Sequence, residues 1–266
     1  MEDFSHEASK FLELASEQRL DILLRLCEKK SKVSAMAKEL DATIQQVDKN
    51  FERLTKANMI VKESDGFYHL TTFGETICIQ VPSLIFLSRH MKYFSDHNFG
   101  TVPKKFVMRI GALADGQYLK GITVVLDRWK EIFKNANEYI YGIISEEALD
   151  HIEPIVNQIK KGVKVNSIFA EGAIVPKGRK DLLAKIGFNK LVQNGLIERK
   201  MKKEVNALVV LNEKEACVTF PKIDGDYDIS SMFFSTDPLF HEWCLDYFRY
   251  CWYGSDVFQE SKLKVT

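Results

Sequence analysis

Residues 34–73 constrain the fold of this chain more than any other stretch, because two helical patterns are followed there by two strand patterns. Ser34 is a natural N-cap for a first helix, and residues 41–43 break that helix. Thr43 is then placed to cap a second helix. The apolar residues of the second helix, spaced to form one buried stripe, are Val47, Phe51 and Leu54. The pattern predicts two packed helices joined by a tight turn.

Two short strands are expected directly after the second helix. Residues 59–61 are apolar, residues 67–70 are mostly aromatic or apolar, and a Ser-Asp-Gly turn separates the two runs. Helix, tight turn, helix and hairpin, in this order, are typical of a winged helix-turn-helix. We therefore predict a winged helix-turn-helix domain over residues 1–75, with an additional helix at its start.

The outward faces of the second helix carry residue types that contact nucleic acids. Amide side chains can pair with base edges in a major groove, and cations can pair with phosphates. A polar helix face is usually only solvated, so it is the hairpin after it that favours double-stranded DNA as the partner. The predicted DNA-binding residues are Thr43, Gln45, Gln46, Lys49, Asn50, Arg53 and, at the base of the hairpin, Lys62.

The charge balance of the chain gives no global attraction to nucleic acid. Lys+Arg and Asp+Glu both number 37, so the formal net charge is +0. DNA binding would then have to come from a local basic face. The composition argues against a protein that coats nucleic acid tightly without preference for a base sequence.

The cysteines and the apolar runs bear on the compartment. The five cysteines form no Cys-x-x-Cys pair, which is typical of reduced, buried thiols in a cytoplasm. A redox pair of Cys244 and Cys251 is the alternative. We recognise neither a signal peptide nor a membrane span. The expected protein is cytoplasmic and has no membrane partner.

A connector helix that begins at Thr71 or Thr72 is predicted to continue over residues 76–98. Pro82 should kink this helix or divide it in two. The connector and the N-terminal helix both have apolar faces, formed by Ile77, Val81 and Leu84 and by Phe4 and Phe11. A second copy of the chain would cover such faces, so we predict a homodimer, with ordinary core packing as the alternative.

Residues 99–256 predict an α/β domain with a mixed sheet, which makes the whole chain a two-domain protein of mixed α and β structure. A strand at 139–144, a helix at 146–161 and a strand at 163–169 are spaced as a parallel crossover. Further strand-like runs lie at 196–201, 207–211 and 216–220. Asp237 and Pro238 favour the start of a closing aromatic helix. The polar residues 257–266 predict a flexible tail.

Three runs of this chain resemble a family of archaeal regulators. They are LTTFGE at 70–75, VPKKFVMRIGAL at 102–113 and FFSTDPLFHEWCLDYFRYCWYGS at 233–255. These runs are similar to those of archaeal winged-helix transcription regulators whose C-terminal half is the effector domain first described in a methanogenesis regulator. That domain resembles the sugar-sensing domain of TrmB-type regulators and, through it, the phospholipase D fold.

The resemblance implies a DNA-binding transcription regulator whose C-terminal domain senses a small molecule and changes operator binding. The residues by themselves predict only the DNA-binding half. One departure concerns the tip of the hairpin, residues 63–66, which is acidic where winged helices often carry Arg or Lys. Lys62 and His69 are left as the candidates for contacts by the hairpin.

Catalytic signatures are absent from the sequence. Phospholipase D chemistry needs a His nucleophile, a Lys and a later Asp, and the chain has only His90-Met91-Lys92 with Asp96 one residue early. We interpret this match as chance and expect no enzyme, no cofactor and no metal site. The two alternatives are an enzyme of degenerate phospholipase D-like fold and a winged-helix architectural or basal factor that needs no ligand.

Two sets of residues are candidates for the effector site. Lys177 and Arg179 lie in a basic loop that could hold an anion, although a solvated loop is the simpler interpretation. Trp243 and Tyr250 could line a hydrophobic cavity, although aromatic residues at helical spacing usually form a core.

Overall fold

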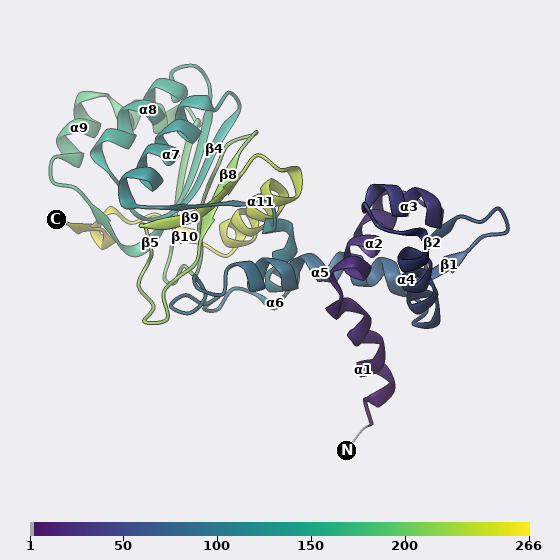
Figure 1. Ribbon diagram of the computed structural model, residues 1–266. Coiled ribbons are helices and arrows are strands. Elements are labelled where there is room, and N and C mark those ends of the chain that lie inside the picture. The colour runs from purple at the N-terminus through teal and green to yellow at the C-terminus, as the bar shows by residue number, and fades with distance from the viewer. Residues whose placement is uncertain (1–2) are drawn as a thin grey trace. The chain divides into compact units, whose positions relative to one another are not determined.

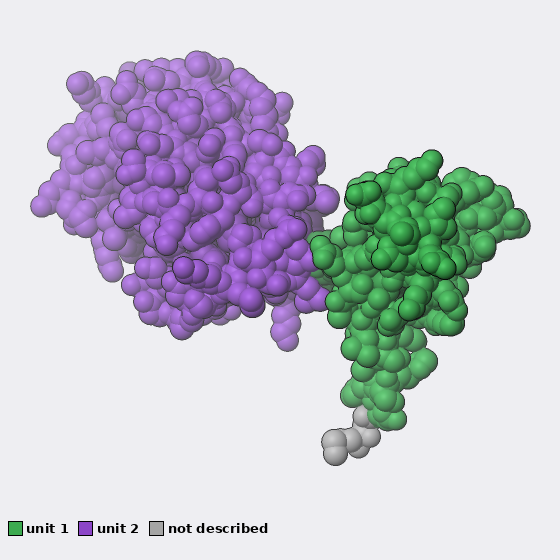
Figure 2. All heavy atoms as spheres, in the orientation of Figure 1, with its two compact units in different colours: residues 1–82 green, residues 83–266 purple. Residues whose placement is uncertain are grey.

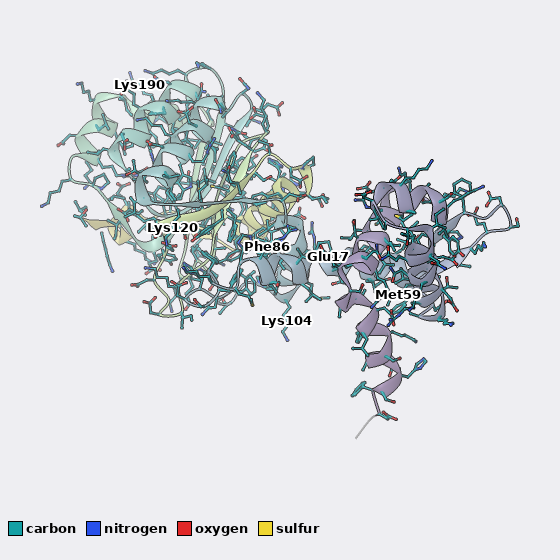
Figure 3. All side chains as sticks on the ribbon, viewed as in Figure 1. Glu17, Met59, Phe86, Lys104, Lys120 and Lys190 are labelled. Atoms are coloured by element: carbon teal, nitrogen blue, oxygen red, sulfur yellow. The ribbon has the colours of Figure 1, made fainter. Side chains whose placement is uncertain are left out.

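The computed structural model describes residues 3–266, and the chain divides into two compact units, Met1–Pro82 and Ser83–Thr266 (Figures 1 and 2). We call them unit 1 and unit 2. Met59 in unit 1 and Phe86 in unit 2 are both fully buried, each in its own unit (Figure 3). The division at residue 82 falls inside the segment expected to be a separate connector. The prediction of a two-domain chain of mixed α and β structure is confirmed.

Unit 1 is helical except for one hairpin. Its elements are α1 (Ser5–Phe11), the 3-10 helix η1 (Leu12–Ala15), α2 (Glu17–Glu28), α3 (Val33–Glu39), α4 (Ile44–Lys56), β1 (Ile60–Lys62), β2 (Tyr68–Leu70) and the first part of α5 (Thr72–Arg89). Strands β1 and β2 are antiparallel, with Val61 opposite His69. The two helices and the hairpin expected from residues 34–73 are therefore present in that order.

Local chemistry explains the turn between α3 and α4. Asp41 has a positive φ of 48°, a conformation that Asp and Asn tolerate better than most residues. The predicted stripe of Val47, Phe51 and Leu54 is fully buried. The ring of Phe51 meets Tyr68 of β2 edge to face at 4.7 Å, which packs α4 against the hairpin.

The start of α3 differs from the prediction. The helix begins at Val33, one residue before Ser34, and Lys32 occupies the N-cap position without a side-chain cap. The preceding residue, Ser31, exchanges two backbone hydrogen bonds with Tyr68, which holds it in an extended bridge to the hairpin. The helix therefore starts as soon as the chain leaves this bridge.

Gly74 explains why a glycine occurs in the LTTFGE run. A Cβ atom at this position would lie 2.0 Å from the carbonyl oxygen of Met59. Thr71 donates a side-chain hydrogen bond to the carbonyl of Asn58 at 2.7 Å and accepts one from the amide of Gly74 at 3.1 Å. These contacts fix the start of α5 next to the end of α4.

Pro82 does not divide α5 into two helices, because the helix runs from Thr72 to Arg89 with Pro82 inside it. The missing N–H removes one backbone hydrogen bond of the helix without ending it. The predicted connector thus begins as part of this single helix.

Unit 2 is built on a mixed sheet. Its elements after α5 are α6 (Lys104–Val107), η2 (Ile110–Leu113), β3 (Gln117–Lys120), α7 (Ile122–Asn135), β4 (Tyr139–Glu146), α8 (Leu149–Ile159), β5 (Lys164–Val175), α9 (Arg179–Lys185), α10 (Phe188–Gln193), β6 (Ile197–Lys202), β7 (Leu208–Leu211), β8 (Ala216–Thr219), β9 (Ser231–Ser235), α11 (Pro238–Tyr253), β10 (Asp256–Val257), η3 (Glu260–Lys262) and β11 (Lys264–Val265). In the described chain the strand order is β10-β6-β5-β4-β7-β8-β9-β3, and β11 pairs with β5. Strands β4, β5 and β6 are parallel, whereas β7, β8, β9 and β3 join antiparallel, so the predicted mixed sheet is confirmed.

Helices cover both faces of this sheet (Figure 1). Helix α7 packs with one face, and α11 packs with the other. Strand β4 shows the alternation that this requires, because Ile140 belongs to the core under α7 and Ile143 to the core under α11. The predicted parallel crossover of β4, α8 and β5 is present, with Ile143 opposite Ile168. Strands β3 and β9 and helix α7 were not predicted.

Residues of the segment 257–266, which was predicted to be a flexible tail, pair with the sheet. Strand β10 pairs with β6, and β11 pairs in parallel with β5, with Lys264 opposite Ile174. A polar segment can still satisfy its backbone groups along a strand, whatever its side chains are. The amide of Thr266 also donates to the carbonyl of Val175 at 3.1 Å.

The expectations about thiols and membranes can be compared with the structure as well. Cys27 is exposed, and the other four cysteines are buried. The prediction of buried thiols therefore fails for Cys27 alone. Among the helices of residues 3–266, none combines the length and the apolar character that crossing a membrane requires.

Candidate functional site

The outward face of α4, opposite its buried stripe, is the first candidate site. Gln45 and Lys49 are exposed on this face. Because they are four residues apart on a helix, their side chains are neighbours. An amide beside a cation is the combination that can contact a base edge and a nearby phosphate. The structure leaves both of these predicted residues accessible to a partner.

Thr43 and Gln46 have a structural role at the start of α4. The amide of Gln46 donates to Thr43 Oγ1 at 3.2 Å, and the amide of Thr43 donates to Gln46 Oε1 at 3.2 Å. The Thr43 hydroxyl also donates to Gln46 Oε1 at 3.0 Å. This capping box confirms Thr43 as the N-cap. The side-chain carbonyl oxygen of Gln46 thus accepts hydrogen bonds from Thr43, which leaves the side-chain amide nitrogen to contact a base.

Asn50 and Arg53 are also held by the protein. Asn50 Nδ2 donates to Gln18 Oε1 on α2. The Arg53 guanidinium donates to both carboxylate oxygens of Glu13, at 2.9 and 2.8 Å. The hydrogen bond from Arg53 holds the pKa of Glu13 below its usual value. Glu13 also pairs with Arg19 at 2.7 Å, so residues before α2 bind the second half of the α4 face.

Lysines near the hairpin partly compensate the acidic charges of its tip. Glu63 forms a salt bridge with Lys30 at 2.8 Å, which offsets one of the two acidic charges. The ammonium groups of Lys30 and Lys32 lie over the ring of Phe67, at 5.1 and 4.8 Å from its centroid. Lys62 is exposed and lies over the ring of Tyr68 at 5.5 Å. The basic run at 29–32 was the sequence signal for these additional cations.

Of the two residues predicted to hold an anion, Lys177 and Arg179, the structure pairs Arg179 with carboxylates of the protein. The Arg179 side chain is only 4% exposed and is paired with Glu147 and Glu260. Its charge is therefore already compensated by two carboxylates, while Lys177 is exposed. The sequence could not show this, because Glu260 lies 81 positions away from Arg179.

Trp243 and Tyr250 do not share a cavity wall. Trp243 is fully buried, and its indole N–H donates to the carbonyl of Phe106 at 3.0 Å. Tyr250 is half-exposed, with the Lys105 ammonium 4.5 Å from its ring centroid. Trp243 thus belongs to the core between α11 and the sheet, the simpler of the two interpretations.

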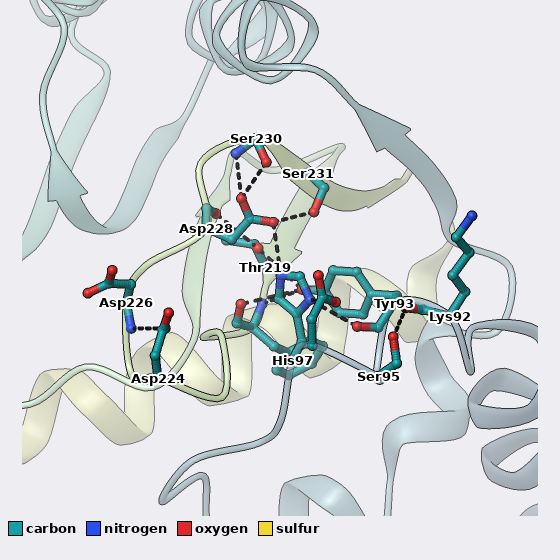
Figure 4. Close-up of polar contacts among 12 residues, drawn as sticks. Lys92, Tyr93, Ser95, His97, Thr219, Asp224, Asp226, Asp228, Ser230 and Ser231 are labelled. Carbon is teal, nitrogen blue, oxygen red and sulfur yellow. Dashed lines mark hydrogen bonds and ion pairs between the residues drawn. The ribbon is translucent and has the colours of Figure 1, made fainter.

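A cavity of about 530 Å³ in unit 2 was missed by sequence reasoning. It is formed by the end of α5, the segment 90–97, strand β3 and the loop before β9. We call it the His97 cavity after the residue at its floor (Figure 4). Its lining residues are Arg89, His90, Lys92, Tyr93, Asp96, His97, Tyr118, Lys120, Lys222, Asp228, Ser230 and Ser231.

The floor of the His97 cavity is a buried hydrogen-bond network. His97 Nε2 lies 3.0 Å from Asp228 Oδ2, and Nδ1 lies 2.7 Å from Asp96 Oδ1 and 2.9 Å from the carbonyl oxygen of Tyr93. Both ring nitrogens thus face oxygen atoms of the protein. The Tyr93 ring stacks on His97 with centroids 3.8 Å apart. His97 is therefore fixed in position and orientation.

Asp228 is held by two serines. The amide and hydroxyl of Ser230 donate to Oδ1 at 2.8 and 2.6 Å, and the Ser231 hydroxyl donates to Oδ2. Burial by itself would raise the pKa of Asp228, but these hydrogen bonds and that from His97 outweigh it and lower the pKa. Asp228 is therefore a stable carboxylate at neutral pH.

The His90-x-Lys92 match with Asp96, interpreted as chance, lies at this cavity. His90, Lys92 and Asp96 all line it. This spacing was the only local signal, since Asp228 lies 131 positions from His97. Within residues 3–266, no three or more His, Cys, Asp or Glu side chains are grouped to hold a metal ion.

Comparisons with known proteins give distant structural likenesses alone. No family model matches the chain, and no curated protein matches it. Among solved structures, it is similar to TrmBL2, an archaeal chromatin protein that binds DNA, with 11% identity, a TM-score of 0.43 and coverage of 86% of this chain and 88% of that one. A phospholipase D family member, Nuc from Salmonella typhimurium, matches 55% of this chain over 100% of its own length, at 15% identity and a TM-score of 0.39. NucT from Helicobacter pylori matches 54% of this chain and 99% of its own, at 13% identity and a TM-score of 0.41.

Proposed function

We propose that unit 1 is a winged helix-turn-helix and that α4 enters the major groove of double-stranded DNA. The observation that carries this proposal is the exposed pair Gln45 and Lys49 on a capped helix whose opposite face is fully buried. Lys32 and Lys62, in front of α3 and on the hairpin, would contact the flanking phosphates. Gln45 would read a base edge, and Lys49 would bind a phosphate or a guanine.

The whole chain is then a transcription regulator, in which unit 2 senses a small molecule and modulates operator binding. An effector can act only through different affinities for the DNA-binding arrangements, and the DNA must change effector affinity by the same factor. A homodimer is part of the proposal, because Phe4, Phe11 and Leu84 of the predicted surfaces are exposed, whereas Ile77 and Val81 are buried within the protein. Sedimentation that detects only the 30.6 kDa chain at micromolar concentration would reject the dimer.

The DNA contact can be tested with two substitutions on α4. An operator is first selected from random duplexes, and binding is measured by mobility shift. We expect Gln45→Ala to lose about 1–3 kcal/mol and to relax the preference at one base pair. Lys49→Ala should weaken binding to all sequences and reduce the salt dependence of log K by about 0.9, one phosphate contact.

The matched control is Lys185→Ala, which removes an exposed lysine from α9 in unit 2. Its affinity for the operator should equal that of the wild type. Circular dichroism and the unfolding transition verify that each variant is folded. If neither α4 variant changes operator affinity while both remain folded, α4 is not the recognition helix.

A further inference from the structure

The His97 cavity has an excess of positive charge at its rim. Four cations line it, namely Arg89, Lys92, Lys120 and Lys222, against the two carboxylates of Asp96 and Asp228. Both carboxylates are engaged with His97, and Asp228 also with its two serines. None of the four cations forms a salt bridge in the part of the chain from residue 3 to residue 266, although such pairs are frequent elsewhere in the molecule. Their charges are available to a ligand.

Strand pairing brings the rim together. The edge strand β3 pairs antiparallel with β9, which places Lys120 opposite Ser231 and Tyr118 opposite Phe233. The residues of the segment 90–97 reach the same place from the end of α5, and Ser230 and Ser231 come with Asp228 (Figure 4). The cations therefore surround a floor that the hydrogen bonds of Asp228 already hold in place.

One wall of the cavity is aromatic. The His90 ring lies 6.1 Å from that of Tyr118, and Tyr118 lies 5.7 Å from Tyr93. Burial, and then the neighbouring charge of Arg89, lower the pKa of His90, so this imidazole is uncharged at neutral pH. A flat, uncharged surface beside a cluster of cations suits a ligand that has a ring and a separate anionic group.

We propose that the His97 cavity binds a small organic phosphate whose phosphate contacts Lys92, Lys120 and Lys222 and whose ring lies against His90 and Tyr118. The three lysines are mobile point charges of the kind that commonly binds phosphate, and the guanidinium of Arg89 at the same rim can also pair with a phosphate. The cavity volume of about 530 Å³ falls within the range of small-molecule sites. The floor of this cavity is concave and buried, which distinguishes it from a row of surface cations that contacts the phosphates of a DNA backbone.

This inference assigns the effector site of the proposed regulator and rests on that function only for the effect on DNA. Binding itself is measured on the full chain without DNA, by calorimetry with adenosine 5′-monophosphate, inorganic pyrophosphate and citrate as probes. The wild type should bind the monophosphate. The double substitution Lys92→Ala/Lys120→Ala should raise its dissociation constant about tenfold or more, since charge-assisted contacts to the phosphate are lost.

The control Lys160→Ala/Lys185→Ala removes two exposed lysines that do not line this cavity, and it should bind like the wild type. Lys222→Ala gives a second, independent loss of affinity. The inference is overturned if the monophosphate does not bind at millimolar concentration, or if it binds equally to the cavity variants. It is also overturned if citrate is the only probe that binds.

A last arm separates the cavity from DNA. If Lys92→Ala/Lys120→Ala weakens binding of an unrelated duplex as strongly as it weakens the monophosphate, the rim is a DNA phosphate tract and the inference fails. If the monophosphate binds but the chain has no operator affinity, the cavity stands and the proposed regulator fails. These outcomes keep the two ideas distinguishable.

Discussion

Breaking the contact between Glu13 and Arg53 is predicted to strengthen DNA binding. Arg53 lies on the outward face of α4, and both of its hydrogen bonds to Glu13 use the donors that a phosphate would need. The Arg53 side chain is 47% exposed, so water and a phosphate can reach it. Replacing Glu13 with Gln removes the competing carboxylate and keeps the shape of the side chain. Glu13→Gln should therefore bind the operator more tightly at low salt.

The size of the effect follows from the number of phosphates contacted. One additional contact steepens the slope of log K against log salt by about 0.9, so Glu13→Gln should lose about 3.5-fold more affinity than the wild type between about 50 and 200 mM salt. Arg19 keeps its own place in this substitution, because it also donates to the backbone carbonyls of Glu13 and Leu12 at 3.0 and 3.3 Å.

The assay is a salt titration of operator affinity by fluorescence anisotropy. Glu7→Gln is the matched control, because it removes the same charge from the exposed helix α1 without touching Arg53. The combined variant Glu13→Gln/Arg53→Ala should lose the added steepness. If Glu13→Gln has the wild-type slope, or if Glu7→Gln steepens it equally, Arg53 does not reach a phosphate and the reasoning for this residue is refuted.

Three further predictions concern stability. Thr43→Ala removes the side-chain acceptor of the capping box and should destabilise unit 1 by about 1 kcal/mol in urea, whereas an unchanged transition would show that the cap contributes little. Trp243→Ala should destabilise unit 2 by roughly 3–5 kcal/mol, because the fully buried indole also loses its hydrogen bond to Phe106, and a smaller loss than that of Tyr250→Ala would contradict its place in the core. Folding lowers the pKa of Asp228, so its contribution to the free energy of unfolding is complete above the ordinary carboxyl range near pH 4 and is lost as the pH falls through the lowered pKa. In an acid titration, Asp228→Asn should lack this loss of stability. An acid unfolding curve identical to that of the wild type would contradict the prediction.

The parts of unit 1 that sequence reasoning predicted depend on neighbours along the chain. The stripe of Val47, Phe51 and Leu54 repeats with the helix, and Thr43 caps within three residues, so both are visible in a short window. The start of α3 was misplaced because Ser31 bridges to Tyr68, a contact that no local pattern contains. Local periodicity thus predicted the elements, and tertiary pairing moved one boundary.

The predicted DNA-binding residues show the same division. Residue type and spacing placed Gln45 and Lys49 correctly on an exposed face. The same reasoning could not show that Arg53 is paired with Glu13, 40 positions earlier, or that Asn50 is bonded to Gln18, 32 positions earlier. A polar helix face identified from sequence therefore contains more residues than can contact a partner, because some of its side chains already bind other residues of the protein.

The missed cavity and the missed strands have one cause. Strand β3 lies at the edge of the sheet and is mostly exposed, whereas β9 is almost entirely buried, so neither shows an alternation of buried and exposed residues. Without the pairing of β3 with β9, Lys120 and Ser231 have no reason to be neighbours, and without the bridge between His97 and Lys222, Asp228 has no reason to approach His97. The His90-x-Lys92 spacing by itself is an imperfect match to a catalytic motif and does not indicate a binding site. Knowledge of both backbone pairings would have placed these side chains around one cavity, which is why tertiary pairing constrains this ligand site more strongly than residue spacing does.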